Sequence, residues 1–138
     1  MHNEKETIRV VYCAPGRTSR ITEIGSGLED LQRAVGGGLI EPFYPFEEEV
    51  CLVVNEEGKS NGMRPNRAVY DEDGKLIGII FGPFFICDCS GENFGSLSDE
   101  QAEKYRKQFE LPENFVRTEQ GINLSISACS RSDSRKTG

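Results

Sequence analysis

The side chains best suited to ligand binding lie in one polar segment, Asn55 to Ala68, between two strongly apolar runs. Within it Arg64 and Arg67 flank a Pro-Asn pair, and guanidinium groups bind phosphate or carboxylate groups with two parallel hydrogen bonds. Turn-forming polar residues surround them. The segment therefore supplies the candidate ligand-binding residues for a small nucleotide: Asn55, Lys59, Arg64, Asn66 and Arg67.

Acidic residues are concentrated in the same central part of the chain. The net charge is −7, and positions 41 to 73 hold nine Asp or Glu but only three Lys or Arg. A negative field repels nucleic-acid phosphates and attracts basic surfaces, so we expect a basic protein partner and no direct binding of nucleic acid. The candidate partner-binding residues are Phe43, Tyr44, Glu47, Glu48, Glu49, Glu56, Glu57, Asp71, Glu72 and Asp73.

The aromatic run Pro42 to Phe46 beside these acids has two interpretations. Its rings can pack in the core, or they can form an exposed aromatic patch rimmed by acids, which is typical of a protein-binding site. The sequence leaves both open.

Candidates for catalysis are weak. A Cys or Ser nucleophile needs a base, usually His, and the only histidine is His2. Cys87 and Cys89 lie on the same side of a predicted strand and could offer two thiols to a metal, but a structural zinc site needs four ligands. Buried thiols are the simpler interpretation. We therefore expect a protein that is not an enzyme and has neither a metal nor a cofactor.

Glycines 36 to 38 could form an anion-binding nest of backbone N–H groups. They follow a predicted helix C-terminus, however, where the helix dipole has the wrong sign for an anion. We interpret them as a helix stop.

The chain length, the apolar runs and the number of cysteines indicate one cytoplasmic domain. A length of 138 residues suits a single core. The longest apolar run is about twelve residues, fewer than the roughly twenty that span a membrane, and the first residues contain no export signal. Five cysteines, an odd number found mostly in strand-like runs, favour reduced thiols in the cytosol.

The first half of the chain reads as strands around one short helix. β-branched residues predict strands at Ile8 to Cys13 and Ser19 to Ile24. A capping box at Ser26 to Glu29 opens a helix that stops at Gly36. Two prolines make 39 to 46 an edge strand or a kinked one, and Val50 to Val54 reads as a buried strand.

The second half repeats this pattern. An acidic turn, Asp71 to Lys75, joins strands 68 to 70 and 76 to 81, and a further strand covers 84 to 89. A second capping box, Ser98 to Gln101, begins a helix that ends before Pro112. Residues 122 to 128 predict a weak strand, and 130 to 138 read as disordered.

These elements predict an α+β fold, a small and mostly antiparallel sheet of about five to six strands with two short helices packed on it. The expected organisation is a flexible N-terminus over 1–7, a single domain over 8–116, and a weakly structured polar tail over 117–138.

The order of motifs resembles a known family. Leu28 to Gly37, Asn55 to Lys59, Pro65 to Ala68 and Leu97 to Phe109 follow one another as in the family called domain of unknown function 3846. The resemblance covers about Ile8 to Pro112. It implies a protein of phages, plasmids and integrative elements, encoded near counter-defence genes, without an established enzymatic activity.

Residues and resemblance together predict a non-enzymatic accessory protein of a mobile element in the bacterial cytosol. It would inhibit a bacterial defence system, as anti-CRISPR or anti-restriction proteins do, by stoichiometric binding of a defence or nucleic-acid-processing protein through its acidic surface. The alternative is a sponge that sequesters a small nucleotide immune signal on the five ligand-binding candidates.

Overall fold

A five-stranded antiparallel sheet forms the centre of the molecule, in the order β2-β1-β7-β4-β3. The computed structural model describes residues 6–118 and 121–124. Its central strands are β1 (Thr7–Cys13), β2 (Arg20–Gly25), β3 (Ile40–Phe43), β4 (Val50–Asn55) and β7 (Phe84–Asp88). The other elements are α1 (Leu28–Ala34), α2 (Asp99–Gln108) and two hairpins, β5 (Pro65–Tyr70) with β6 (Leu76–Phe81) and β8 (Phe115–Thr118) with β9 (Gly121–Leu124). The predicted α+β class is confirmed.

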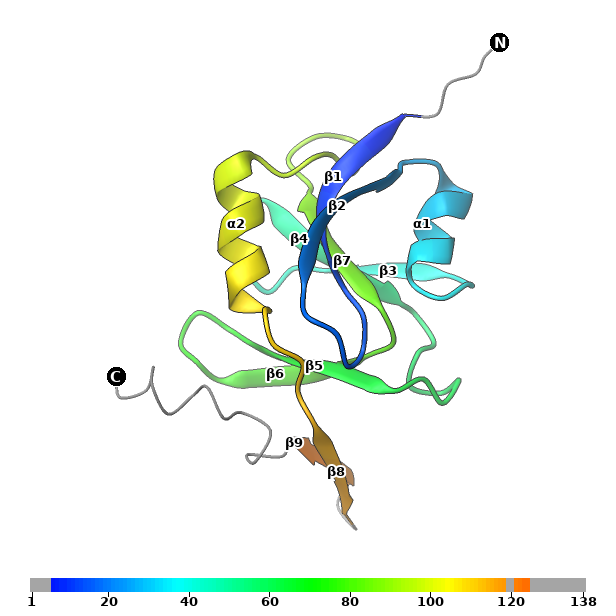
Figure 1. Cartoon of the computed structure of the whole chain (residues 1–138), viewed down its shortest axis with the longest axis vertical. Helices are drawn as coiled ribbons and strands as arrows, with labels where there is room; N and C mark the ends of the chain where they lie inside the picture. The colour runs from blue at the N-terminus through cyan, green and yellow to red at the C-terminus, as the bar shows by residue number, and fades with distance from the viewer. Residues whose placement is uncertain (1–5, 119–120, 125–138) are drawn as a thin grey trace.

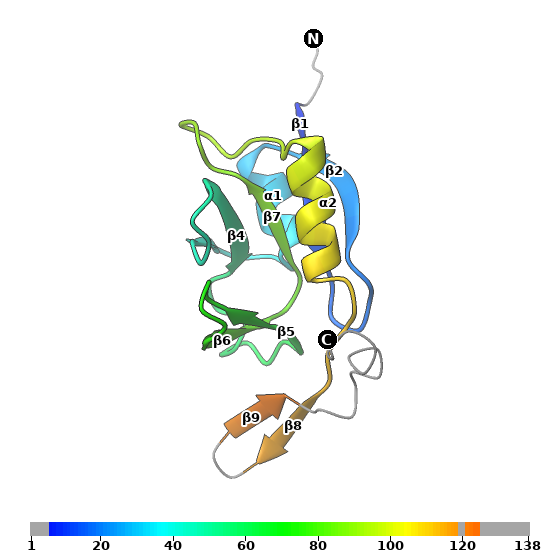
Figure 2. The ribbon, with the colours of Figure 1, turned by 90° about the vertical axis from the view of Figure 1, so that its left-hand side faces the viewer.

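The two faces of the sheet carry separate hydrophobic clusters. Side chains of a strand alternate between faces, so the neighbours Cys51 and Leu52 enter different clusters. On one face α1 supplies Leu31 to a cluster that also contains Cys51. On the other, α2 supplies Tyr105 to a cluster shared with the β5–β6 hairpin. Figure 1 shows the two helices on opposite sides of the central strands, and Figure 2 shows the β5–β6 hairpin beyond the end of β4.

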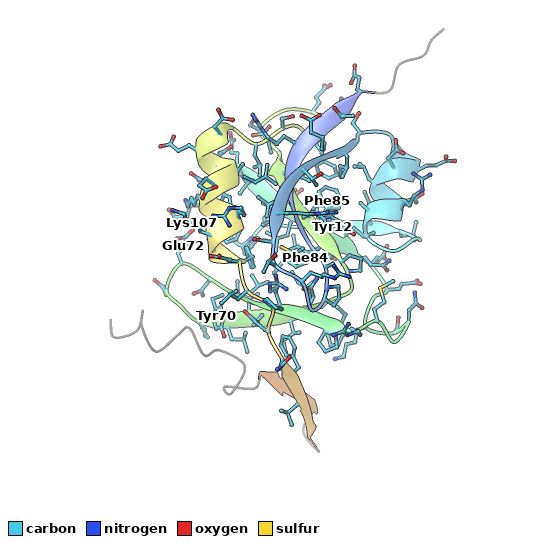
Figure 3. All side chains as sticks on the ribbon, viewed as in Figure 1. Tyr12, Tyr70, Glu72, Phe84, Phe85 and Lys107 are labelled. Atoms are coloured by element: carbon cyan, nitrogen blue, oxygen red, sulfur yellow. The ribbon has the colours of Figure 1, made fainter. Side chains whose placement is uncertain are left out.

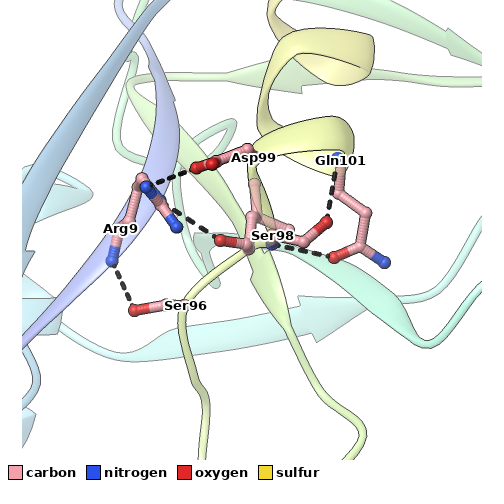
Figure 4. Close-up of polar contacts among 6 residues, drawn as sticks. Arg9, Ser96, Ser98, Asp99 and Gln101 are labelled. Atoms are coloured by element: carbon pink, nitrogen blue, oxygen red, sulfur yellow. Dashed lines mark hydrogen bonds and ion pairs between the residues drawn. The ribbon is translucent and has the colours of Figure 1, made fainter.

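The N-terminus of α2 is held by the predicted capping box. Ser98 Oγ accepts from the Gln101 N–H at 3.1 Å, and the Gln101 side chain accepts from the Ser98 N–H at 3.2 Å. Arg9 of β1 ties this end to the sheet through an ion pair with Asp99 at 2.7 Å and a hydrogen bond to the Leu97 carbonyl (Figure 4). A local sequence signal and a tertiary contact therefore define the same helix start.

The predicted capping box of α1 is wrong. The N-cap is Gly27, without a side-chain hydrogen bond, and the Ser26 hydroxyl donates instead to the Glu6 carbonyl at 3.3 Å. The predicted stop is confirmed, because Gly36 has a φ of 95°, which favours glycine.

Three strand predictions need adjustment. β5 begins at Pro65, before the expected 68, and β8 was not expected at all. β9 overlaps the start of the weak strand expected at 122–128, whose residues 125–128 lie outside the described residues. Of the expected tail over 117–138, residues 119–120 and 125–138 lie outside the described residues, as does most of the expected N-terminal segment.

Candidate protein-binding surface

The structure joins two acidic segments that are distant in sequence. The backbone N–H of Glu47, in the loop between β3 and β4, donates to Glu72 Oε2 at 3.1 Å. Glu72 belongs to the turn between β5 and β6, on the side of the molecule that carries α2 (Figure 3). We call the surface formed by Glu47, Glu48, Glu49, Asp71, Glu72 and Asp73 the acidic surface.

Helix α2 holds one residue of this surface in place. The Tyr105 hydroxyl donates to Glu48 Oε1 at 2.5 Å, and Lys104 Nζ lies 3.4 Å from the same oxygen. The hydrogen bond from Tyr105 holds the pKa of Glu48 below its usual value. Burial, helped by the bond to Glu48, raises the pKa of Tyr105. The Phe46 ring packs 5.0 Å from the Tyr105 ring, so the acidic loop is anchored to α2 by both apolar and polar contacts.

The aromatic run beside the loop is divided between the two arrangements that its sequence left open, with two rings packed inside and one exposed. Phe43 and Phe46 are partly buried and pack against the core cluster under α2. Tyr44 is 61% exposed, so it is the ring of this run that a partner could reach. Asp71 has a local role, since its carboxylate accepts from the Asp73 and Lys75 N–H groups at 2.9 Å and closes the turn.

Glu56 and Glu57 do not join the acidic surface. They follow β4, whereas Glu47 to Glu49 precede it, and a strand of six residues is about 17–20 Å long. The single acidic region of the sequence is therefore two groups at opposite ends of β4.

The expected phosphate site around Arg67 does not form, because Asn66 and Arg67 are fully buried. Arg67 Nε and Nη2 donate to the Phe109 carbonyl at 3.0 and 2.9 Å, and Nη2 also donates to the Arg17 carbonyl at 2.7 Å. Arg67 Nη1 donates to Asn66 Oδ1, whose amide donates to the Cys13 and Gly82 carbonyls. These side chains join β5 to the ends of β1 and α2 and are closed to a ligand.

Asn55 is also a structural residue. Its amide donates to the Val35 and Gly37 carbonyls at 3.0 and 2.6 Å, and its Oδ1 accepts from the Glu57 N–H at 2.9 Å. It therefore satisfies carbonyl groups after α1 and shapes the turn after β4. The carbonyl of Gly37, one of the glycines of this helix stop, is thus held by the Asn55 side chain.

The two remaining candidates have different neighbours. Lys59 Nζ lies 5.9 Å from the centre of the Phe81 ring. The Arg64 guanidinium lies beside the β1–β2 turn, where a Cβ on Gly16 would come within 3.3 Å of it. The five residues predicted to surround a nucleotide are thus dispersed, three of them in the interior.

Sequence reasoning missed a groove between β3 and β6, which we call the β3–β6 groove. It has a volume of about 570 Å³ and combines apolar walls with charged residues at its rim. The sequence signal was Gly78 inside an apolar strand, since such a glycine often marks a close approach of another group. The groove is lined by Glu41, Phe43, Val54, Asn55, Glu56, Gly58, Lys59, Leu76, Gly78, Ile79, Ile80 and Phe81.

Three of the four described thiols lie in strands of the sheet, as expected for core residues, and Cys89 directly follows β7. Cys13, Cys51 and Cys87 are buried and Cys89 is partly buried, and all four are free thiols. Cys51 and Cys87 face one another across β4 and β7 with their sulfurs 3.9 Å apart. Within residues 6–118 and 121–124, no group of three or more His, Cys, Asp or Glu side chains is placed to hold a metal ion. None of the helices in this part of the chain is long and apolar enough to cross a membrane.

Comparison with known proteins identifies a family but no characterised relative. The model of a domain of unknown function, DUF3846, matches residues 8–110. No curated protein and no solved structure matches the chain.

Proposed function

The chain belongs to the DUF3846 family, and from that premise we propose that it is a non-enzymatic inhibitor of a bacterial defence system. It acts stoichiometrically, as an anti-CRISPR or anti-restriction protein encoded by a phage or other mobile element. Its target is a defence or nucleic-acid-processing protein with a basic surface, and binding occurs in the host cytoplasm.

The observation that carries this proposal is the hydrogen bond between the Glu47 N–H and Glu72 at 3.1 Å. It brings two short runs of three acids together, which gives a local negative field that neither run has alone. The exposed Tyr44 follows β3 at the start of the same loop, and tyrosine is enriched among residues that dominate binding energy. An acidic surface with an aromatic anchor fits a protein channel that binds nucleic acid.

Charges at the rim of a protein interface, such as those of the acidic surface, mainly accelerate association, and dissolved salt screens them. Inhibition should therefore weaken as ionic strength rises. The alternative, a nucleotide sponge, has little support. Three of its five candidate ligand-binding residues, Asn55, Asn66 and Arg67, are buried.

The test is the plating efficiency of a targeted phage on bacteria that carry a restriction or CRISPR system and express this protein. The double variant Glu47→Lys with Asp73→Lys should lose protection of the phage, because both residues are exposed on the acidic surface and the substitutions reverse its charge. The matched control, Glu92→Lys with Glu110→Lys, makes the same change of charge at exposed positions elsewhere.

Equal protection by both double variants would contradict the acidic surface as the binding site. Depletion of a cyclic nucleotide by the purified protein, without a product and without capture of a defence protein, would support the sponge instead. Purified target and inhibitor should form a complex whose affinity falls by about tenfold or more between low and high salt in the wild type.

A further inference from the structure

We propose that the β3–β6 groove binds an extended, basic and apolar peptide segment of a partner protein, which adds as a strand to the free edge of β6. This inference does not rest on the proposed function, because the groove and the acidic surface share no residue.

The open edge of β6 is the first observation. Within the described part of the chain, β6 pairs with β5 alone. The groove is lined by five residues of β6 and by none of β5, so it lies on the side of β6 that faces away from its partner. Backbone N–H and C=O groups on such an edge are available to another strand, and peptide recognition by strand addition uses them.

The opposite wall favours β6 as the pairing strand. β3 is the edge strand of the main sheet and is only four residues long, with Pro42 at its third position. Proline has no N–H to donate, so β3 offers an incomplete set of hydrogen bonds. β6 has six residues and no proline. A peptide in the groove would therefore pair with β6 and lie against the side chains of β3 and β4.

A side-chain pocket lies at Gly78. Gly78 pairs with Val69 across the hairpin, and paired residues of an antiparallel ladder place their side chains on the same face. Val69 is buried in the core cluster, yet a Cβ on Gly78 would meet no atom within 4 Å. The absence of a side chain on the inward face of β6 leaves space, and an apolar side chain of the peptide can fill it.

The rim selects a basic peptide. Glu41 and Glu56 line the groove and are exposed, and neither forms an ion pair with another described residue. Lys59 lies at the Phe81 end, over the aromatic ring. A Lys or Arg next to the apolar anchor residue would pair with Glu41 or Glu56, and an acidic peptide would be repelled.

The test is selection from a phage-displayed library of short random peptides on the immobilised full-length protein, followed by synthesis of a selected peptide. We expect selected sequences with Lys or Arg beside Val, Ile, Leu or aromatic residues. Hydrogen exchange should show slower exchange of β6 amides when the peptide is bound, which is the signature of strand addition. Selection of no peptide, or protection confined to other elements, would overturn the proposal.

Two matched variants locate the binding site. Gly78→Leu fills the groove at a position with open space and an ordinary φ, and it should weaken peptide binding at least about tenfold while the protein stays folded. Gly91→Leu makes the same substitution at another open, exposed position and should bind as the wild type does. Equal binding by the two variants would contradict the assignment to the groove.

A charge variant tests whether the groove prefers a basic peptide, and a concentration series tests whether a second copy of the chain occupies the edge of β6 instead. Glu41→Lys should weaken binding of a basic peptide and leave the fold unchanged, since the Glu41 side chain is exposed. If β6 amides become protected as protein concentration rises without any peptide, the edge pairs with a second copy of the chain and the peptide proposal fails.

Discussion

Arg67 donates two hydrogen bonds to the carbonyl oxygen of Phe109, the C-cap residue of α2, at 3.0 and 2.9 Å. A cation at the C-terminal end of a helix interacts favourably with the helix dipole. Burial lowers the pKa of Arg67, yet an arginine remains charged because its pKa begins so high. A residue whose type suggested phosphate binding is therefore a link between the hairpin, α2 and the β1–β2 turn.

The first prediction concerns this link. Arg67→Met should lower the free energy of unfolding by at least about 2 kcal/mol, since it leaves two buried acceptors, the Phe109 carbonyl and Asn66 Oδ1, unpaired at about 1–3 kcal/mol each. Urea denaturation followed by circular dichroism measures the change. Arg64→Met, an exposed arginine in the same segment, is the control and should stay within about 0.5 kcal/mol of the wild type. Similar losses for both variants would show that Arg67 has no special structural role.

The second prediction concerns Asn55 after α1. Asn55→Ala should cost about 1–3 kcal/mol of stability, because the Val35 and Gly37 carbonyls and the Glu57 N–H lose their partner. Hydrogen exchange should also accelerate at the C-terminal end of α1 and in the turn after β4. Asn61→Ala, at an exposed position of the same turn, should change neither measurement.

The third prediction is a pH dependence from the Tyr105–Glu48 hydrogen bond. Because the folded-state pKa of Glu48 is lowered from 4.5, its contribution is fully present above that value and is lost as pH falls through the folded pKa. Tyr105→Phe should cost about 1 kcal/mol at neutral pH. The difference from the wild type should shrink in acid below the ordinary carboxyl pKa, in denaturation curves measured across that range.

The same pair titrates at the alkaline end with the opposite sign. The pKa of Tyr105 is raised from 10.0, chiefly by burial, so the folded state keeps the proton longer than the unfolded state. The stability contributed by the neutral hydroxyl is present below 10 and is lost as pH rises through the folded pKa. A difference between wild type and Tyr105→Phe that stays constant from acid to alkali would contradict the coupling.

The fourth prediction concerns thiol reactivity. Burial raises the pKa of Cys13 to about 12 and that of Cys89 to about 11. The neighbouring Cys51 thiol and burial raise the pKa of Cys87, while the hydrogen bond from Cys87 lowers that of Cys51, which is fully buried. At about pH 8, iodoacetamide should label these four residues slowly in the native protein.

Peptide mapping by mass spectrometry would measure that labelling residue by residue. The same reaction in urea is the control, because unfolding removes both the burial and the pKa shifts, and all four thiols should then react quickly. Rapid labelling of Cys13 or Cys87 in the native protein would show that the sheet opens on the timescale of the reaction.

Local sequence signals predicted most helices and strands of this protein, because caps, turns and apolar runs act on neighbouring residues. Runs of β-branched and apolar residues predicted the main strands, the Ser98–Gln101 pair predicted the start of α2, and Gly36 predicted the end of α1. Two predictions failed for other reasons. Ser26 donates to the backbone carbonyl of Glu6, a residue distant in the sequence, and so does not cap α1. β5 begins at Pro65, although proline is confined to strand starts and edges.

The sequence by itself therefore determined the α+β class, the acidic character and the family of the chain. Only the tertiary structure decided where each side chain lies. It divided one acidic region between the two ends of β4, buried Arg67 against the end of α2, and opened a groove beside Gly78. The physical reason is that burial and field strength depend on neighbours from distant segments, which sequence spacing does not specify.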